Sequence, residues 1–357
     1  MAYTSYFSQS YEEARARLRA SIEQAKGEYE AYPIGIEGPD GDPLTIDIGR
    51  IGPADAKRTL VLSSGTHGVE GFFGSAAQLA AIENWVEQPD RDASLVLIHA
   101  MNPYGFSYIR RVNENNVDLN RSFLLSDQPY QGADDAYAKL NPLLNPETLP
   151  SKRDLFLVRT VFNILRYGYR SLKNAVVQGQ YEFPKGLFYG GRKPPKTLEI
   201  IDQHLETWLG DAEKVVHIDW HTGMGKWATY ILATSRSMGT PGAEALQTIF
   251  GRDRVQGLEP SGVLYEIQGA FGRWCESRFS DRDYSCLLAE FGTYPSLKVL
   301  KALSDENRCH HWDTASGPAT AASKQALREA FAPSASEWRN RCISQAMTIV
   351  EQAKRGL

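Results

Sequence analysis

Two side chains of the kind that bind metal ions stand close together in the segment SSGTHGVEG. His67 and Glu70 are three positions apart, where an apolar run gives way to residues that favour a helix. An imidazole and a carboxylate in such a turn can converge on one cation. On its own the pair is a weak indication, because a capped helix start explains it more simply.

A third ligand is offered by the segment VVHIDWHTG. If this segment is a strand, its alternation places His217, Asp219 and His221 on one face. His221, at the strand's end, is the better ligand; His217 is expected to be a hydrogen-bonded core residue or a supporting group, and Asp219 could orient a ligand histidine. Two imidazoles and one carboxylate leave a tetrahedral zinc ion with one open position, as a catalytic site requires. We therefore expect one zinc ion per chain, held by His67, Glu70 and His221.

A polar loop rich in arginine follows the apolar run SLVLIHA. Arg121 is suited to bidentate pairing with a carboxylate, and Asn120 adds a further donor. Arg110 or Arg111 could face the negative charge that develops on a carbonyl oxygen during a reaction. The alternative for these residues is ordinary solvation at the surface. The loop therefore favours an anionic ligand.

The ordered motifs HGVE, NPYG, RVNENNVDLNR, DWHTG, LYEIQGAFGRW and LLAEFG resemble the carboxypeptidase A-like zinc metallopeptidase superfamily. The resemblance spans roughly residues 57–295. It implies a zinc site at the His–Glu–His set described above. It also implies that Asn120 and Arg121 hold the terminal carboxylate of the substrate.

The resemblance further implies which groups act on the scissile bond. Glu290, in LLAEFG, matches the general base that takes a proton from the attacking water and passes it to the leaving nitrogen. Arg111 matches the arginine that stabilises the oxyanion, and Tyr265 matches a mobile tyrosine. Arg273 would favour an acidic substrate side chain if it points inward, but an arginine beside a tryptophan is more often stacked or solvated.

The expected function is a zinc-dependent hydrolase that cleaves an amide bond next to a free carboxylate, most simply a metallocarboxypeptidase. The segment FPKGLFYGG departs from digestive-type carboxypeptidases and looks like an uncharacterised bacterial subfamily. Succinylglutamate desuccinylase and aspartoacylase share the HxxE and DLNR motifs, so an N-acyl amino acid deacylase is the alternative. A zinc-containing peptide-binding module without catalysis is a third hypothesis, against which Glu290 argues.

The elements that must position these residues alternate between strand and helix. The sequence predicts an amphipathic helix from about Ser10 to Glu30, short strands, and a helix over residues 70–86. The alternation indicates an α/β fold with a mixed, mostly parallel sheet flanked by helices, and the resemblance implies its zinc carboxypeptidase-like form. We expect one catalytic domain over residues 1–357, with residues 124–210 as a helical insertion or side lobe. The expected strands are YPIGI, LTIDIGRI, TLVLSSG, SLVLIHA, VVHIDWHT and CLLAEFG.

Composition and charge limit the partners and the compartment. The 357 residues are 42% hydrophobic and carry a net charge of −4, without the basic patch that nucleic acid or an anionic membrane would require. No apolar run is long enough to cross a bilayer, and the first residues do not resemble a targeting signal. The four cysteines form no CxxC pair, which favours a cytoplasmic location. The expected partner is a peptide or N-acyl amino acid with a free carboxylate, and the oligomeric state is left open.

The sequence lacks the motifs of several other enzyme classes. There is no GxSxG elbow, P-loop or dinucleotide fingerprint, so serine hydrolase, nucleotide and redox functions are set aside. Cys309, His310 and His311 form another metal-like cluster. Consecutive residues cannot easily aim three donors at one ion, so we expect a solvated loop there.

Overall fold

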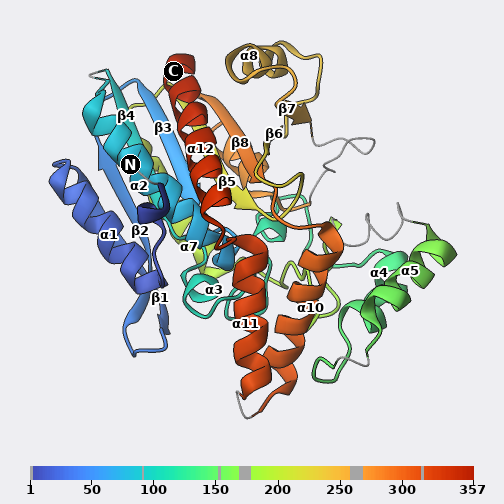
Figure 1. Ribbon diagram of the computed structural model, residues 1–357. Helices are drawn as coiled ribbons and strands as arrows, with labels where there is room; N and C mark the ends of the chain where they lie inside the picture. Colours follow the sequence, from blue (N-terminus) through green and yellow to red (C-terminus); the bar gives the residue numbers. More distant parts are fainter. Residues whose placement is uncertain (1–2, 91, 152–153, 169–177, 258–267, 315–316) are drawn as a thin grey trace.

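The described residues form one sheet of eight strands. The computed structural model describes residues 3–90, 92–151, 154–168, 178–257, 268–314 and 317–357. The strand order across the sheet is β1-β2-β4-β3-β5-β8-β6-β7 (Figure 1). The strands are β1 (Glu28–Glu37), β2 (Pro43–Ile51), β3 (Arg58–Ser64), β4 (Ala93–His99), β5 (Lys214–Thr222), β6 (Tyr230–Thr234), β7 (Val255–Gly257) and β8 (Asp283–Phe291).

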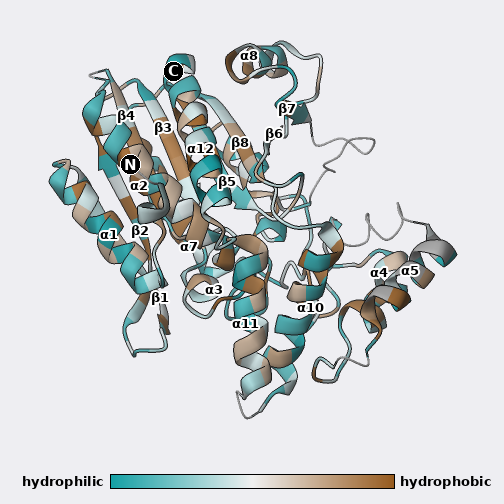
Figure 2. Cartoon of the chain, in the orientation of Figure 1, coloured by the Kyte–Doolittle hydropathy of each residue, from teal (hydrophilic) through white to brown (hydrophobic). Residues whose placement is uncertain are grey.

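The centre of the sheet is parallel and its margins contain the antiparallel pairs. β4, β3, β5 and β8 run parallel to one another, whereas β1 pairs with β2, β2 with β4, and β6 with β8 in antiparallel fashion. The central strands are buried on both faces, and β3 and β4 accordingly contain continuous apolar runs, as Figure 2 shows. The predicted fold class, a mixed and mostly parallel sheet flanked by helices, is confirmed.

Helices cover both faces of the sheet. Successive side chains of a strand point to opposite faces, so neighbouring residues meet different helices. Along β3, Leu60 and Leu62 belong to the core beneath α1, α2 and α12, whereas Val61 belongs to the opposite core beneath α7 and α9. Figure 1 shows α1, α2 and α12 together on the first face. These helices are α1 (Tyr11–Gln24), α2 (Gly71–Glu87), α7 (Lys196–Leu209), α9 (Phe271–Arg278) and α12 (Ser336–Gly356).

Among the remaining helices, α8 packs against α12 and β7, whereas α3 and α11 pack against the turn η2 that follows β3. Apolar side chains of α4 and α5 join a third core with those of α10 and α11, and Figure 1 shows α4 and α5 beside α10. Within residues 124–210, α7 packs on the sheet, while α4 and α5 lie against α10; the side lobe itself stays a prediction. The elements are α3 (Pro103–Ser107), α4 (Asp135–Leu144), α5 (Phe156–Tyr167), α8 (Pro241–Phe250), α10 (Ser296–Trp312), α11 (Pro318–Phe331), and the 3-10 turns η1 (Tyr3–Tyr6), η2 (Gly68–Glu70) and η3 (Leu119–Arg121).

Two local predictions differ from the structure. The N-terminal helix ends at Gln24, and β1 begins at Glu28. Cys309, His310 and His311 lie in α10 rather than in a solvated loop, because the helical spacing of buried side chains continues up to Cys309. No helix among the described residues is long and apolar enough to span a membrane.

Candidate metal centre

Three side chains converge at the carboxyl ends of β3 and β5. His67 follows β3 and precedes the turn η2, Glu70 ends that turn, and His221 is the last residue but one of β5. His67 Nδ1 lies 2.8 Å from Glu70 Oε1, and His221 Nδ1 lies 3.0 Å from Glu70 Oε2. The two Nδ1 atoms are 3.2 Å apart. Three groups that favour the same cation therefore share one small volume, and all three are buried.

A glycine allows this turn to approach the arginine loop. A Cβ atom on Gly68 would lie 2.0 Å from the backbone of Gly105, so a larger residue does not fit. The close approach lets Gly68 N donate to Arg111 O at 3.1 Å and Val69 N donate to Arg110 O at 2.8 Å. The HGVE segment and the arginine loop are thus held as one unit.

Carboxylates behind the two imidazoles favour the tautomers that a metal ion needs. His221 Nε2 lies 2.6 Å from Asp219 Oδ2, and His67 Nε2 lies 3.1 Å from Asp118 Oδ1. A carboxylate accepts, so with a cation bound each Nε2 would donate to its carboxylate and each Nδ1 would offer its lone pair to the ion. Arg111 Nη2 lies 2.7 Å from the same nitrogen of His67 and favours the opposite tautomer, whereas an ion bound at Nδ1 would require the Nε2–H form.

The ligand atoms lie close enough together to share one zinc ion. Zinc–nitrogen and zinc–oxygen bonds of about 2.0–2.2 Å in a tetrahedron separate neighbouring ligand atoms by about 3.3–3.6 Å. The separations here, 2.8 Å to Glu70 Oε1, 3.0 Å to Glu70 Oε2 and 3.2 Å between the two Nδ1 atoms, are slightly shorter. The donor set, two imidazoles and one carboxylate, is also one that zinc prefers. The described residues are therefore compatible with a zinc ion.

Charges around the cluster compensate each other in the absence of a cation. Burial alone would raise the pKa of the Glu70 carboxyl, but the imidazoles of His67 and His221 outweigh it and lower that pKa. Burial opposes protonation of His221, yet Asp219 and Glu70 raise its pKa well above the ordinary value. His221 thus holds a proton between two carboxylates. A divalent cation would take the place of that proton, so binding should release it.

Glu290 stands beside the cluster on the next strand. It pairs in register with His221 across β5 and β8, and its Oε1 accepts from Met224 N at 2.7 Å. Burial, and then the charge of Glu70, raise the pKa of the Glu290 carboxyl to about 7. A carboxyl group with a pKa near neutrality is suited to take up and return a proton.

The structure shows which of two neighbouring arginines, Arg110 or Arg111, lies at the cluster. Arg111 donates from Nε to Asp118 Oδ2 at 2.9 Å and lies 3.4 Å from Glu70 Oε1, with 11% of its side chain exposed. Arg110 is fully buried and donates to Glu306 Oε1 at 2.9 Å, on α10. Arg111 is therefore the arginine at the cluster, and Arg110 anchors the loop behind it.

Asn120 and Arg121 belong to the turn η3 that Asp118 caps. Asp118 Oδ1 accepts from Asn120 N at 3.1 Å, which places the capping carboxylate between this turn and His67. Arg121 is 4% exposed, and among the described residues no partner hydrogen-bonds to its Nε. Asn120 lines a cavity of about 20 Å³ together with Asp219 and Arg273. Tyr265 lies outside the described residues.

Comparison of the sequence with models of known protein families gives one match. The sequence model of the family described as "Protein of unknown function (DUF2817)" matches residues 7–345. The chain belongs to this family. No curated protein matches its sequence.

Several solved structures are similar in fold at low identity. Carboxypeptidase A from Helicoverpa armigera is 13% identical, with 90% of this chain and 73% of that chain covered and a TM-score of 0.49. A metallo-carboxypeptidase from Burkholderia cenocepacia is 13% identical, with coverages of 96% and 71% and a TM-score of 0.40. A murein-tripeptide amidase from Escherichia coli O157 is 18% identical, with coverages of 78% and 91% and a TM-score of 0.35.

Asp118, Ser63 and Thr66 also belong to this centre, although sequence reasoning assigned them no role. Asp118 contacts His67 and Arg111, and the hydroxyl groups of Ser63 and Thr66 donate to Asp219 Oδ1 at 2.6 and 3.1 Å. For Asp118 a signal existed, since an acidic residue stands directly before the Leu-Asn-Arg of the DLNR motif. The two hydroxyls gave no signal, because serine and threonine are common at strand ends.

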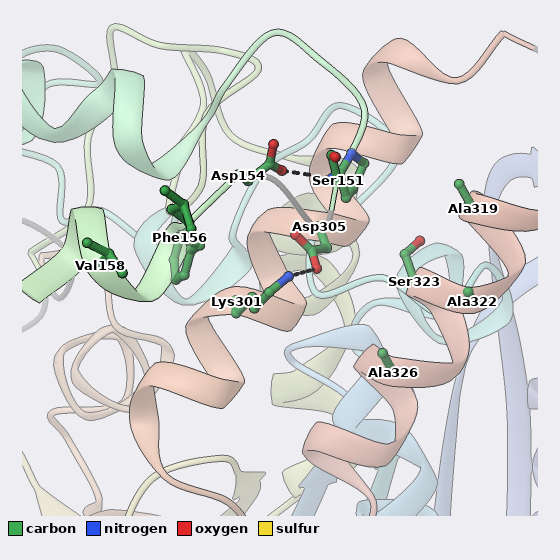
Figure 3. A pocket seen from close by; sticks show the side chains of 12 residues that line it. Ser151, Asp154, Phe156, Val158, Lys301, Asp305, Ala319, Ala322, Ser323 and Ala326 are labelled. Carbon is green, nitrogen blue, oxygen red and sulfur yellow. Dashed lines mark hydrogen bonds and ion pairs between the residues drawn. The ribbon is translucent and has the colours of Figure 1, made fainter.

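A larger cavity lies away from this centre, between the start of α5 and the helices α10 and α11. It measures about 680 Å³ and is shown in Figure 3. Its charged groups are paired, Lys301 with Asp305 and Asp154 with Arg308. None of the predicted site residues lines it.

Proposed function

We propose that this chain is a zinc-dependent hydrolase that cleaves an amide bond next to a free carboxylate, as a metallocarboxypeptidase does. The observation that carries the proposal is the convergence of His67, Glu70 and His221, with Glu290 beside them on the adjacent strand. A binding-only protein would have no need for a carboxyl group with a pKa near neutrality next to a metal site.

In this proposal Glu290 carries out the proton transfers of the reaction. A zinc ion held by the three ligands supplies Lewis acidity towards a carbonyl oxygen and makes water more acidic. Glu290 accepts the proton of the attacking water and returns it to the leaving nitrogen. The backbone N–H of Met224 holds one oxygen of that carboxylate at 2.7 Å, which leaves the other oxygen available.

The proposal gives the arginines two different tasks. Arg111 lies at the rim of the cluster and would stabilise negative charge on the carbonyl oxygen. Arg121 is a buried cation whose Nε has no hydrogen-bond partner among the described residues, and burial lowers its pKa. A substrate carboxylate would supply the missing acceptor, with Asn120 as a second donor, and would position the scissile bond. Tyr265 keeps the predicted auxiliary role.

The experiment is elemental analysis of the purified protein combined with a substrate screen. The screen compares peptides with a free C-terminus, the same peptides with an amidated C-terminus, and N-acyl amino acids, each with and without chelator. The proposal expects about one zinc per chain, chelator-sensitive release of a free amino acid, and no cleavage of amidated peptides. Preference for N-acyl amino acids would make the chain a deacylase.

Two variants serve as controls in this screen. Glu70→Gln removes a ligand and should lose both zinc and activity. Glu199→Gln changes an exposed carboxylate on α7 and should alter neither. Absence of zinc from the wild-type protein, or cleavage that persists in Glu70→Gln, would overturn the proposal.

A further inference from the structure

A line of hydrogen bonds runs from His221 into the interior of the sheet. Asp219 contacts His221 with Oδ2 and accepts from Ser63 Oγ with Oδ1, at 2.6 Å in each case. Ser63 Oγ lies 2.8 Å from His217 Nε2, and His217 Nδ1 lies 2.8 Å from the hydroxyl of Tyr284. The line crosses β5, β3 and β8, three adjacent strands, and all five side chains are buried.

The number of available protons allows only one assignment of donors and acceptors along this line. A carboxylate only accepts, so Ser63 gives its single hydroxyl proton to Asp219 and must accept from His217 Nε2. A neutral imidazole carries one N–H, so His217 Nδ1 must accept from Tyr284. The other tautomer of His217 would require Ser63 to donate to Asp219 and to His217 at once. The directions at Ser63, His217 and Tyr284 therefore depend on one another.

Burial keeps these groups in the states that the line needs. Burial lowers the pKa of His217 to about 4, so its imidazole is neutral at neutral pH. Burial likewise raises the pKa of Tyr284 well above its ordinary value, so its hydroxyl keeps its proton. The same is true of the Cys275 thiol, which hydrogen-bonds to Tyr284 at the far end of the line.

We propose that His217 is a positioning residue for the metal ligand His221, acting through Ser63 and Asp219. By donating to Ser63 it directs the serine hydroxyl towards Asp219, which holds the Asp219 carboxylate against His221 Nε2 and leaves Nδ1 free for the ion. This inference rests on the proposed zinc site. It adds a role for a histidine that touches neither metal ligand nor substrate.

Packing alone does not account for these residues. His217 lies edge-on against Phe271 of α9, with ring centroids 5.4 Å apart, in a place where an apolar ring would pack as well. On the opposite face of β5, Ile218 and Trp220 are apolar and belong to the core beneath α2. Burying a hydroxyl and an imidazole costs free energy unless each is hydrogen-bonded, and here each is.

The test compares two substitutions that separate packing from hydrogen bonding. His217→Phe keeps a ring against Phe271 but removes both nitrogens. His217→Gln loses the ring but keeps a donor that can reach Ser63. Both variants are purified as the full chain and stripped of metal. The zinc dissociation constant is measured by competition with a chromophoric chelator, and the unfolding midpoint of the metal-free protein is measured in parallel.

The inference expects opposite rankings in the two measurements. His217→Phe should weaken zinc binding about tenfold and His217→Gln by less than about threefold, within the range known for groups that support metal ligands. The metal-free stability should rank the other way, because phenylalanine packs better than glutamine at this site. If zinc affinity follows metal-free stability instead, or if His217→Phe binds zinc as wild type does, the positioning role is wrong.

A double-mutant cycle with Ser63→Ala provides a second, independent reading. Because His217 is held to act through Ser63, the loss of zinc affinity caused by His217→Phe should nearly vanish in the Ser63→Ala background. Additive losses would overturn the inference. Thr66 also donates to Asp219, so the cycle measures only the part of the support that passes through Ser63.

The wild-type measurement separates this inference from the proposed function. Tight zinc binding by wild type with additive variant effects would overturn the positioning role and leave the hydrolase proposal intact. Failure of wild type to bind zinc would overturn both. Nitrogen NMR of labelled histidine gives a direct check, since zinc-loaded wild type should show His221 and His217 both protonated at Nε2.

Discussion

Replacing Glu290 by glutamine should have opposite effects on stability and on activity. The two side chains have nearly the same shape, and the amide oxygen can still accept from Met224 N. Only the charge and the ability to take a proton are lost. Metal-free Glu290→Gln should therefore be more stable than wild type at alkaline pH, whereas the zinc-loaded variant should be almost inactive.

The gain in stability follows from the raised pKa of Glu290. In the folded protein the pKa is about 7, compared with an ordinary value of 4.5. At about 1.4 kcal/mol for each tenfold difference, this corresponds to about 3 kcal/mol. Because the folded pKa is the higher one, wild type has its full stability below pH 4.5 and loses this amount as the pH rises through 7. Glutamine does not titrate, so the variant keeps it.

The loss of activity follows from the proposed role as general base. Removal of such a group typically lowers kcat by about 10²- to 10⁴-fold, which is about 3 to 5 kcal/mol in the activation barrier. Zinc content should not fall, because among the described residues the Glu290 carboxylate hydrogen-bonds to Met224 N and not to His67, Glu70 or His221. KM should change little, because the carboxylate anchor is untouched.

The assay is thermal unfolding of the chelator-treated proteins at pH 5 and pH 8, together with steady-state kinetics of the zinc-loaded proteins. At pH 8 the variant should unfold on the order of 5 °C above wild type, and at pH 5 the two should nearly coincide. Glu199→Gln, an exposed carboxylate, is the control and should show no pH-dependent difference. An equal difference at both pH values would refute the burial argument, and kcat within tenfold of wild type would refute the role as base.

Three further substitutions test other contacts. Arg121→Ala should raise KM about 10- to 100-fold for substrates with a free carboxylate, with kcat little changed, because a charged hydrogen bond is lost; unchanged kinetics would remove the anchor role. Asp118→Asn should weaken zinc binding about 10- to 100-fold, measured by chelator competition, since it contacts His67 Nε2; an unaltered dissociation constant would contradict this. Glu306→Gln should destabilise the protein by about 3–5 kcal/mol in urea unfolding, because Arg110 stays buried without its anion; a loss below about 1 kcal/mol would refute it.

Most of the sheet could be predicted because its strands are short apolar runs that end in polar residues. The segments TLVLSSG and VVHIDWHT contain β3 and β5, and the helix predicted over residues 70–86 is α2, Gly71–Glu87. The placement of His67, Glu70 and His221 could be predicted for the same reason. Strand ends of a parallel sheet meet at one edge, so polar residues that follow apolar runs come together there.

The groups behind the ligands could not be predicted, because their partners are distant in the chain. Ser63 and Asp219 are 156 positions apart, and the contact depends on β3 and β5 pairing in the register that sets them side by side. Arg110 and Glu306 are 196 positions apart. Alternation places a residue on a face of a strand, but the register between strands comes only from tertiary structure.

Register connects the stability of the sheet with the chemistry at its edge. Along β5 one face stays apolar, with Ile218 and Trp220 in the core beneath α2, while the other face becomes polar through His217, Asp219 and His221. A slip of β5 by one residue would turn every one of these side chains to the wrong face, burying the polar set beneath α2. The packing that secures the core therefore also secures the ligand geometry. The register sets His221 beside Glu290, and the contact of Asp219 with His221 Nε2 orients the imidazole ring.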